Sequence, residues 1–102
     1  MYSEGIGVPE DDKEAAKWWR MAAEQGNAGA QWFLGDAYQF GRGVIEDRAQ
    51  AYAWYNISAA NGQELGKESK ALVAKEMTKE QIAKAQDLSR EMIEANPKLM
   101  GD

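Results

Sequence analysis

The 102-residue chain contains no cysteine and no histidine. The lack of cysteine excludes disulfides and thiolate metal sites. The lack of histidine removes the commonest general base and the commonest metal ligand, and a serine nucleophile would have no histidine partner. We therefore expect a protein that is not an enzyme, with no catalytic residue, no metal site and no bound cofactor.

The chain is also poor in positive charge and has no long apolar run. Twelve Lys and Arg stand against 17 Asp and Glu, for a net charge of −5, and the basic residues do not cluster. A nucleic-acid binder needs a basic face to neutralise phosphates. A membrane span needs about 20 consecutive apolar residues. We therefore expect neither nucleic-acid binding nor membrane insertion, and a soluble protein whose cytoplasmic or periplasmic location depends on whether an upstream signal peptide exists.

What the sequence does contain is an internal repeat. Residues 2–26 align without a gap on residues 38–62, an offset of 36, with ten identities in 25 positions. A fixed period of this length is typical of repeat architectures, in which each unit buries its apolar face against the next. The identical residues are Tyr2, Gly5, Gly7, Val8, Glu10, Asp11, Ala15, Trp18, Ala23 and Gly26, which fall on Tyr38, Gly41, Gly43, Val44, Glu46, Asp47, Ala51, Trp54, Ala59 and Gly62.

Each copy of the repeat predicts a helix that starts at a capping aspartate. Asp11 and Asp47 are each followed three residues later by Glu or Gln, the spacing of an N-cap and its reciprocal side chain. Apolar residues then recur at helical spacing until Gly26 or Gly62 ends the run. The sequence therefore predicts a helix at about 11–25 and an equivalent helix in the second copy.

A helix of a second kind lies between the two copies. Asn27 is expected to cap it, and its apolar stripe continues to Tyr38 before Gly41 and Gly43 break the helix. Gly35 lies inside this helix, where glycine costs about 1 kcal/mol relative to alanine. We expect this glycine to permit the close approach of a neighbouring helix.

The sequence after residue 62 predicts two more helices. The first runs from about Gln63 to Glu76. The second follows Thr78, which begins a Thr-Lys-Glu-Gln capping box, and stops at Asn96-Pro97 because proline cannot continue a helix.

These features resemble the Sel1-like repeat, a relative of the tetratricopeptide repeat. The resemblance implies an all-α fold, an α-solenoid of antiparallel helix pairs, and it suggests a bacterial protein and a fragment of a longer array. The residues that carry it are Ala28, Ala30, Leu34, Gly35, Tyr38, Gly41, Gly43, Val44, Asp47, Ala51, Trp54, Tyr55, Ala59 and Gly62.

The resemblance also suggests how the chain is divided. We expect one repeat domain over residues 1–95, which begins with a partial repeat at 1–26 and continues with a complete repeat at 27–62. A C-terminal half-repeat with a capping helix follows at 63–95, and residues 96–102 form a tail.

Members of this family are usually adaptors, so the resemblance implies a protein–protein interaction module without catalysis. A protein or peptide partner would bind a concave surface lined by the first helix of each pair. A second hypothesis is an accessory or regulatory component of an enzyme system, such as envelope polysaccharide assembly. Genomic neighbours and the upstream reading frame would separate these two hypotheses.

The candidate partner-binding residues are those that the repeat does not need: Phe33, Asp36, Gln39 and Phe40. Phe33, Asp36 and Phe40 share one helix face, because they are spaced at i, i+3 and i+7. Two aromatic rings beside a carboxylate suit an anchor for a partner. The alternative is that both phenylalanines pack against neighbouring helices.

The aromatic pairs Trp18-Trp19 and Trp54-Tyr55 are expected to form the core of each helix pair. They recur at helical spacing in both copies, which favours a core over a box that stacks on a ligand. One member of each pair points about 100° around the helix from the other, so it is expected to lie between repeats.

The start of the chain bears on the first aromatic pair. Met1 and Tyr2 align with the last residues of the helix between the two copies, so the helix at 11–25 lacks its N-terminal partner. We expect part of the Trp18 and Trp19 surface to be bare and to support self-association as a homo-oligomer through this N-terminal edge.

Two other patterns are better explained by structural roles than by ligand binding. The turns GIGV and GRGV precede helices, but they lack the strand, the Lys and the third Gly of phosphate-binding loops. The acidic groups Glu10-Asp11-Asp12 and Glu46-Asp47 lie at helix starts, where negative charge complements the helix dipole, so we interpret them as caps rather than metal ligands.

Overall fold

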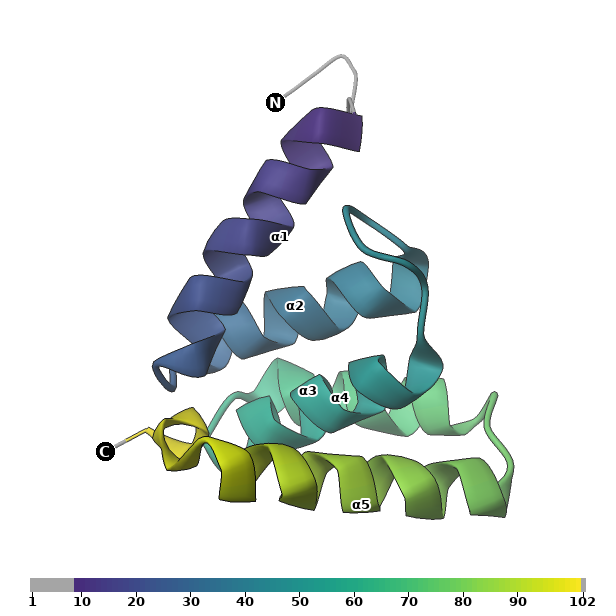
Figure 1. Ribbon diagram of the computed structural model, residues 1–102. Coiled ribbons are helices and arrows are strands. Elements are labelled where there is room, and N and C mark those ends of the chain that lie inside the picture. The colour runs from purple at the N-terminus through teal and green to yellow at the C-terminus, as the bar shows by residue number, and fades with distance from the viewer. Residues whose placement is uncertain (1–8, 102) are drawn as a thin grey trace.

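The computed structural model describes residues 9–101, which fold into five α-helices and a short 3₁₀-helix with no strand among them (Figure 1). The prediction of an all-α fold is thus confirmed. The elements are α1 (Pro9–Glu24), α2 (Ala28–Phe40), α3 (Arg48–Ala60), α4 (Glu64–Ala74), α5 (Lys79–Ala95) and η1 (Pro97–Met100).

Side chains at the predicted positions start three of these helices. Asn27 before α2 and Asp47 before α3 each accept a hydrogen bond from the backbone N–H three residues on, at 2.8 and 3.1 Å. Thr78 and Gln81 form the complete capping box before α5, at 3.0 and 2.9 Å. These contacts satisfy backbone donors that the first turn of a helix leaves without intrahelical partners.

The prediction that Asp11 caps the first helix is wrong. The helix begins two residues earlier, at Pro9, so Asp11 lies inside the first turn. Proline is well suited to the first helical position, because its fixed φ matches the helix and its missing N–H would have no partner there. A carboxylate in this turn still interacts favourably with the helix dipole.

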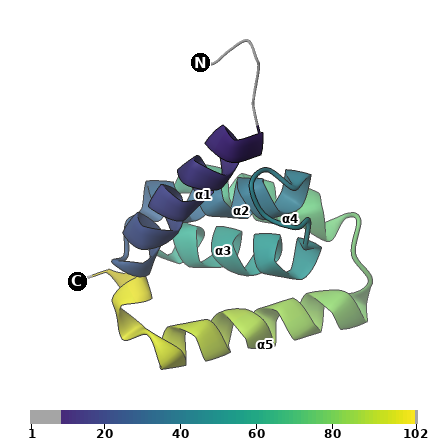
Figure 2. The same ribbon diagram turned by 45° about the horizontal axis from the view of Figure 1, so that its top comes forward.

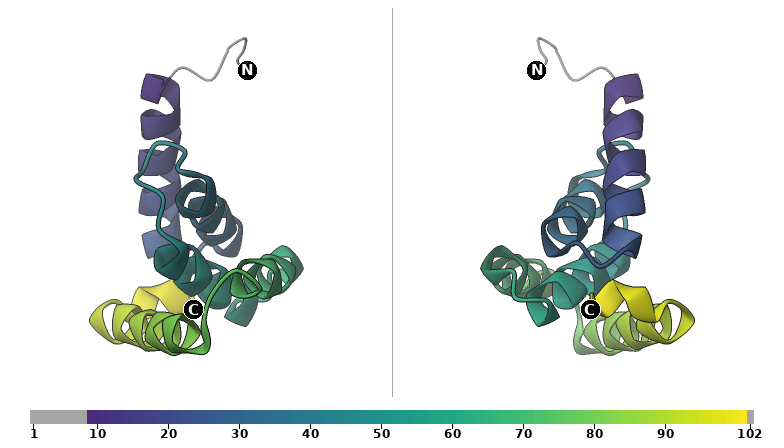
Figure 3. Two further views of the ribbon diagram at one scale, coloured as in Figure 1. Left: turned by 90° about the vertical axis from the view of Figure 1, so that its right-hand side faces the viewer. Right: turned by 90° about the vertical axis from the view of Figure 1, so that its left-hand side faces the viewer.

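Helix α3 lies at the centre of the fold. It packs against α2, α4 and α5, while α1 packs on α2. Figures 2 and 3 show α2 and α5 on opposite sides of α3, and α4 and α5 on different sides of it. Successive helices α1 to α4 therefore stack as alternating layers of a solenoid, and α5 covers the outer side of α3.

Two hydrophobic clusters hold the helices together, and α3 contributes to both. The first contains the buried residues Ala23, Ala30, Leu34, Trp54, Ile57 and Leu99. The second contains the buried residues Ala51, Tyr52, Tyr55, Val73 and Ala85. Trp54 and Tyr55 thus enter different clusters, as expected for adjacent residues about 100° apart on a helix.

Trp18 does not belong to the core, which corrects the prediction that both tryptophans of α1 form the core of a helix pair. Its side chain is 63% exposed, whereas Trp19 is half-buried and packs against the first cluster. None of the described helices therefore buries the Trp18 side chain.

The prediction that residues 96–102 form a tail does not describe the C-terminal segment. Pro97–Met100 form the 3₁₀-helix η1, and Leu99 is buried in the first cluster. The buried side-chain amide of Gln31 donates to the carbonyl oxygens of Ala23 at 3.1 Å and Leu99 at 2.8 Å. Nδ2 of Asn61 donates to the same Leu99 oxygen at 2.7 Å. These hydrogen bonds therefore link Leu99 of η1 to the α1–α2 and α3–α4 junctions.

Candidate functional site

Phe33 and Phe40 both lie on the open side of α2. Their side chains are 45% and 56% exposed. Phe33 stacks on Trp19 of α1, with ring centroids 5.3 Å apart and planes 12° from parallel, and meets Trp32 edge-on at 5.0 Å. The Arg42 guanidinium lies 5.1 Å from the centroid of the Phe40 ring. Phe33 is thus held between two aromatic neighbours, and both phenylalanine rings present apolar surface to solvent.

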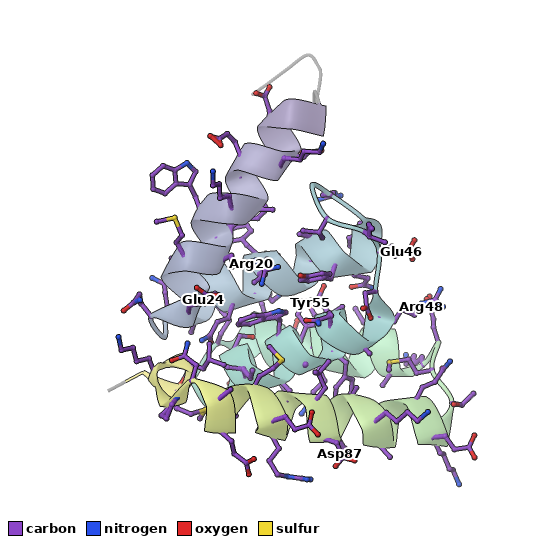
Figure 4. All side chains as sticks on the ribbon, viewed as in Figure 1. Arg20, Glu24, Glu46, Arg48, Tyr55 and Asp87 are labelled. Atoms are coloured by element: carbon purple, nitrogen blue, oxygen red, sulfur yellow. The ribbon has the colours of Figure 1, made fainter. Side chains whose placement is uncertain are left out.

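Asp36 and Gln39 have a partner inside the protein. The Tyr55 hydroxyl lies 2.7 Å from Oε1 of Gln39 and 3.2 Å from Oδ1 of Asp36, and shares its proton between them. Asp36 also forms an ion pair with Arg42 at 3.4 Å. Figure 4 shows Tyr55 in the layer between α2 and α3. Asp36 and Gln39 therefore bind the hydroxyl of a core tyrosine at the edge of the open side of α2.

The environment of Tyr55 stabilises its protonated form. Burial, followed by the negative charge of Asp36 and the hydrogen bond to it, raises the pKa of the Tyr55 hydroxyl above its usual range. The ring fits because α2 has glycine where it crosses α3. A Cβ at Gly35 would lie 2.7 Å from a ring carbon of Tyr55, which confirms the close approach expected at this glycine.

The apolar surface continues onto α4, which the sequence interpretation missed. Leu65 and Leu72 are 46% and 59% exposed. They lie one turn on either side of Ser69, whose hydroxyl accepts a hydrogen bond from the indole nitrogen of Trp32 on α2 at 2.9 Å. This bond joins the two helices on the side that carries both leucines. We call the surface formed by the exposed residues Phe33, Phe40, Leu65 and Leu72 the α2–α4 face.

The 36-residue offset was the signal that could have found the two leucines. It places Gly66 and Val73 of α4 on Ala30 and Ala37 of α2, and all four are buried. The same offset places the leucines at 65 and 72 on Gly29 and Asp36 of α2, which are half-buried rather than part of the core.

The glycine-rich turn has a packing role. Gly43 has a φ of +78°, and a Cβ there would clash with the carbonyl oxygen of Asp12 on α1. The turn therefore lies directly against the backbone of α1, in the left-handed region that glycine adopts without strain. Asp47, at the acidic end of this turn, is the N-cap of α3.

The part of the chain that the structure describes contains neither a metal-binding cluster nor a membrane-spanning helix. Residues 9–101 contain no group of three or more Asp and Glu side chains placed to hold a metal ion. Between Pro9 and Met100, no helix is both long and apolar enough to cross a membrane.

Comparison with known proteins agrees with this arrangement. The family model of the Sel1 repeat matches the chain twice, at residues 1–27 and 28–63. A protective antigen present in uropathogenic Escherichia coli strains, whose crystal structure displays an SLR fold, superposes with a TM-score of 0.80 at 39% sequence identity. The match covers 89% of this chain and 20% of that protein, so the chain spans about a fifth of its solved relative. With alternating helices, two matched repeats and this structural likeness, the chain belongs to the Sel1 repeat family.

Proposed function

We propose that the chain is a protein-interaction module that binds a protein or peptide partner on the α2–α4 face. The Sel1 repeat fold is typically a protein-interaction module and generally a non-catalytic one. The sequence-based candidates Phe33 and Phe40 supply half of this face, and Leu65 and Leu72 supply the other half.

One observation carries the proposal. Among the described residues, eight large hydrophobic side chains are exposed, and four of them lie on α2 and α4, the two helices that the Trp32–Ser69 hydrogen bond joins. Soluble proteins rarely leave apolar side chains contiguous on the surface, and such patches mark interaction sites. Phe33 is already packed against two aromatic rings, so it loses little further rotamer freedom on binding, which favours affinity.

Asp36 and Gln39 contribute to binding indirectly in this proposal. Their oxygen atoms are engaged by Tyr55, so they fix the register of α2 on α3. A partner would meet the aromatic and aliphatic side chains first, with Asp36 and Arg42 as a polar rim on one edge.

The test selects peptides that bind the whole chain from a displayed library and then measures their affinity for variants. Leu72→Asp places a charge in the face and should weaken binding at least about tenfold, the loss expected of a hot-spot residue. The matched control is Ile45→Asp, because Ile45 is 89% exposed but lies in the turn before α3. Equal affinity of both variants for the peptides would reject this face as the binding site.

A further inference from the structure

A cavity of about 260 Å³ opens where α1, α3, α5 and η1 meet. The described residues that line it come from these elements and from the α5–η1 junction, so the cavity is separate from the α2–α4 face. Its volume is several times that of one water molecule, about 30 Å³, and lies just below the range for drug-sized ligands, about 300–1,000 Å³. The cavity therefore has the size for a small molecule or for one residue of a peptide.

Trp54 of α3 lines this cavity and carries an unused hydrogen-bond donor. The residue is 3% exposed, and its indole nitrogen is buried with no partner among the described residues. Between residues 9 and 101, no other buried side-chain nitrogen or oxygen lacks a partner. Native proteins leave few buried donors unsatisfied, because the loss of water around the N–H is then not compensated. A hydrogen-bond acceptor inside the cavity would compensate it.

Arg20 of α1 brings a positive charge to the same cavity. The half-buried side chain donates a hydrogen bond to the Tyr38 hydroxyl, and its guanidinium lies 5.7 Å from the centroid of the Tyr38 ring. None of the three ion pairs found among the described residues includes Arg20. A guanidinium has five N–H donors and pairs well with the two oxygens of a carboxylate. Arg20 is therefore held in place by Tyr38 and keeps donors for an anion.

The rest of the lining is apolar on the side of α5 and η1 and polar at the edge formed by α1. Met92 and Leu99 supply apolar surface, and Gln50 adds a neutral amide. Glu24 is the one carboxylate among the described lining residues. Figure 4 shows Arg20 and Glu24 on the half of α1 that ends next to η1. Because Glu24 is exposed, water and salt screen its repulsion of an anion in the cavity.

We infer that this cavity binds a small organic carboxylate with an apolar body, either a free acid or the C-terminal residue of a peptide. The carboxylate accepts hydrogen bonds from the Arg20 guanidinium and the Trp54 indole N–H, and the body packs against Met92 and Leu99. Charge-assisted hydrogen bonds of this kind are stronger than those between neutral groups. A neutral acceptor such as an amide satisfies Trp54 but leaves the charge of Arg20 without a partner, so the cavity prefers the carboxylate.

Four probes test the carboxylate and distinguish its two sources. Isocaproate and isocaproamide share one apolar body and differ in charge, and acetyl-Gly-Leu with a free or an amidated C-terminus carries the same body on a peptide. Each is titrated at neutral pH into the ¹⁵N-labelled whole chain, and the Trp54 indole N–H signal, assigned with Trp54→Phe, is followed. We expect at least one carboxylate to move this signal with a dissociation constant on the order of 1 mM, and its amide to bind at least about fivefold more weakly. The carboxylate that binds more tightly identifies the source.

Two substitutions with matched controls assign the donors. Arg20→Met keeps an apolar stem and should weaken binding of the carboxylate at least about fivefold. Arg90→Met, on the exposed side of α5, removes the same charge and should leave the affinity unchanged. Trp54→Phe removes the indole N–H and should also weaken binding, followed in this variant by the methyl signals of Leu99, whereas Trp18→Phe at an exposed position should not.

Three results would overturn the inference. The first is a Trp54 signal that neither carboxylate moves at concentrations well above the expected dissociation constant. The second is equal affinity for a carboxylate and its amide. The third is equal loss of affinity in Arg20→Met and Arg90→Met, because the carboxylate would then respond to the overall charge of the chain and not to this cavity.

Discussion

Trp54 and Trp18 occupy the same position in successive copies of the repeat, yet Trp54 is buried under α2 and η1 whereas Trp18 lies on the surface of α1. Residue type and helical position are the same in both copies. The difference comes from the neighbours, because a helix buries its stripe only where another element covers it.

This difference predicts unequal costs of truncation. Trp54→Ala should lower the free energy of unfolding by about 3–5 kcal/mol, the usual cost of removing a buried aromatic side chain. Trp18→Ala should change it by about 0.5 kcal/mol or less, as surface substitutions do. Urea denaturation of the two variants and the parent measures both values. Comparable losses in the two variants would show that Trp18 is buried in solution.

The C-terminal 3₁₀-helix is predicted to contribute to stability through one side chain. Leu99→Ala should cost about 2–5 kcal/mol, because Leu99 is buried among residues of α1, α2 and α3. The control is Met100→Ala at the adjacent, exposed position, which should cost less than about 1 kcal/mol. Thermal and urea unfolding would measure both. If the two substitutions prove equally mild, the C-terminal segment does not hold its place in the core.

Gly43 and Gly62 distinguish the cost of a left-handed backbone from the cost of a steric clash at Cβ. Gly62 has a φ of +94° and open space where a Cβ would stand, whereas Gly43 has a φ of +78° and faces the backbone of Asp12. Gly62→Ala should cost about 1–2 kcal/mol for the left-handed conformation alone. Gly43→Ala should add about 1–3 kcal/mol for crowding. Denaturant unfolding that ranks Gly62→Ala as the costlier change would contradict the contact between turn and α1.

The buried Tyr55 hydroxyl predicts loss of stability at alkaline pH. Because its folded-state pKa is raised, the folded protein keeps this proton above pH 10 while the unfolded chain, with a pKa of about 10, loses it. The free energy of unfolding should therefore be unaffected by Tyr55 below about pH 9 and should fall above pH 10, approaching about 1.4 kcal/mol per pH unit. Tyr55→Phe should remove this part of the slope. Urea unfolding from pH 8 to 11 tests it, and parallel profiles for the two proteins would refute the assignment.

Local patterns were sufficient to predict where helices start and stop. The Thr78 capping box and the Asn27 cap depend on residues three apart in sequence, so the sequence alone carries them. The close approach at Gly35 was also predictable, because glycine inside a helix is costly unless a neighbour needs the space. The prediction failed at Asp11 because Asp11 and Glu14 have the spacing of a helix cap, whereas the helix already begins at Pro9.

Burial and long-range contacts were less predictable, because they depend on distant segments. Leu72 looks like a core residue by its apolar side chain, but its place in the repeat puts it on the open side of α4. The end of α5 before Pro97 was predicted correctly. No neighbouring residue, however, indicates that the carbonyl oxygen of Leu99 accepts a hydrogen bond from Gln31, 68 residues away. Of the candidate site, the aromatic residues Phe33 and Phe40 were found from spacing, while the internal role of Asp36 required Tyr55 to be placed.

The central claim is that a partner binds the α2–α4 face, and chemical-shift mapping tests it most directly. A selected peptide would be titrated into the ¹⁵N-labelled chain, and the amide shifts followed by residue. We predict that the largest shifts cluster at residues 32–40 and 65–72, with α1 and α5 little changed. A peptide that binds and shifts mainly residues of α1 or α5 would contradict the claim.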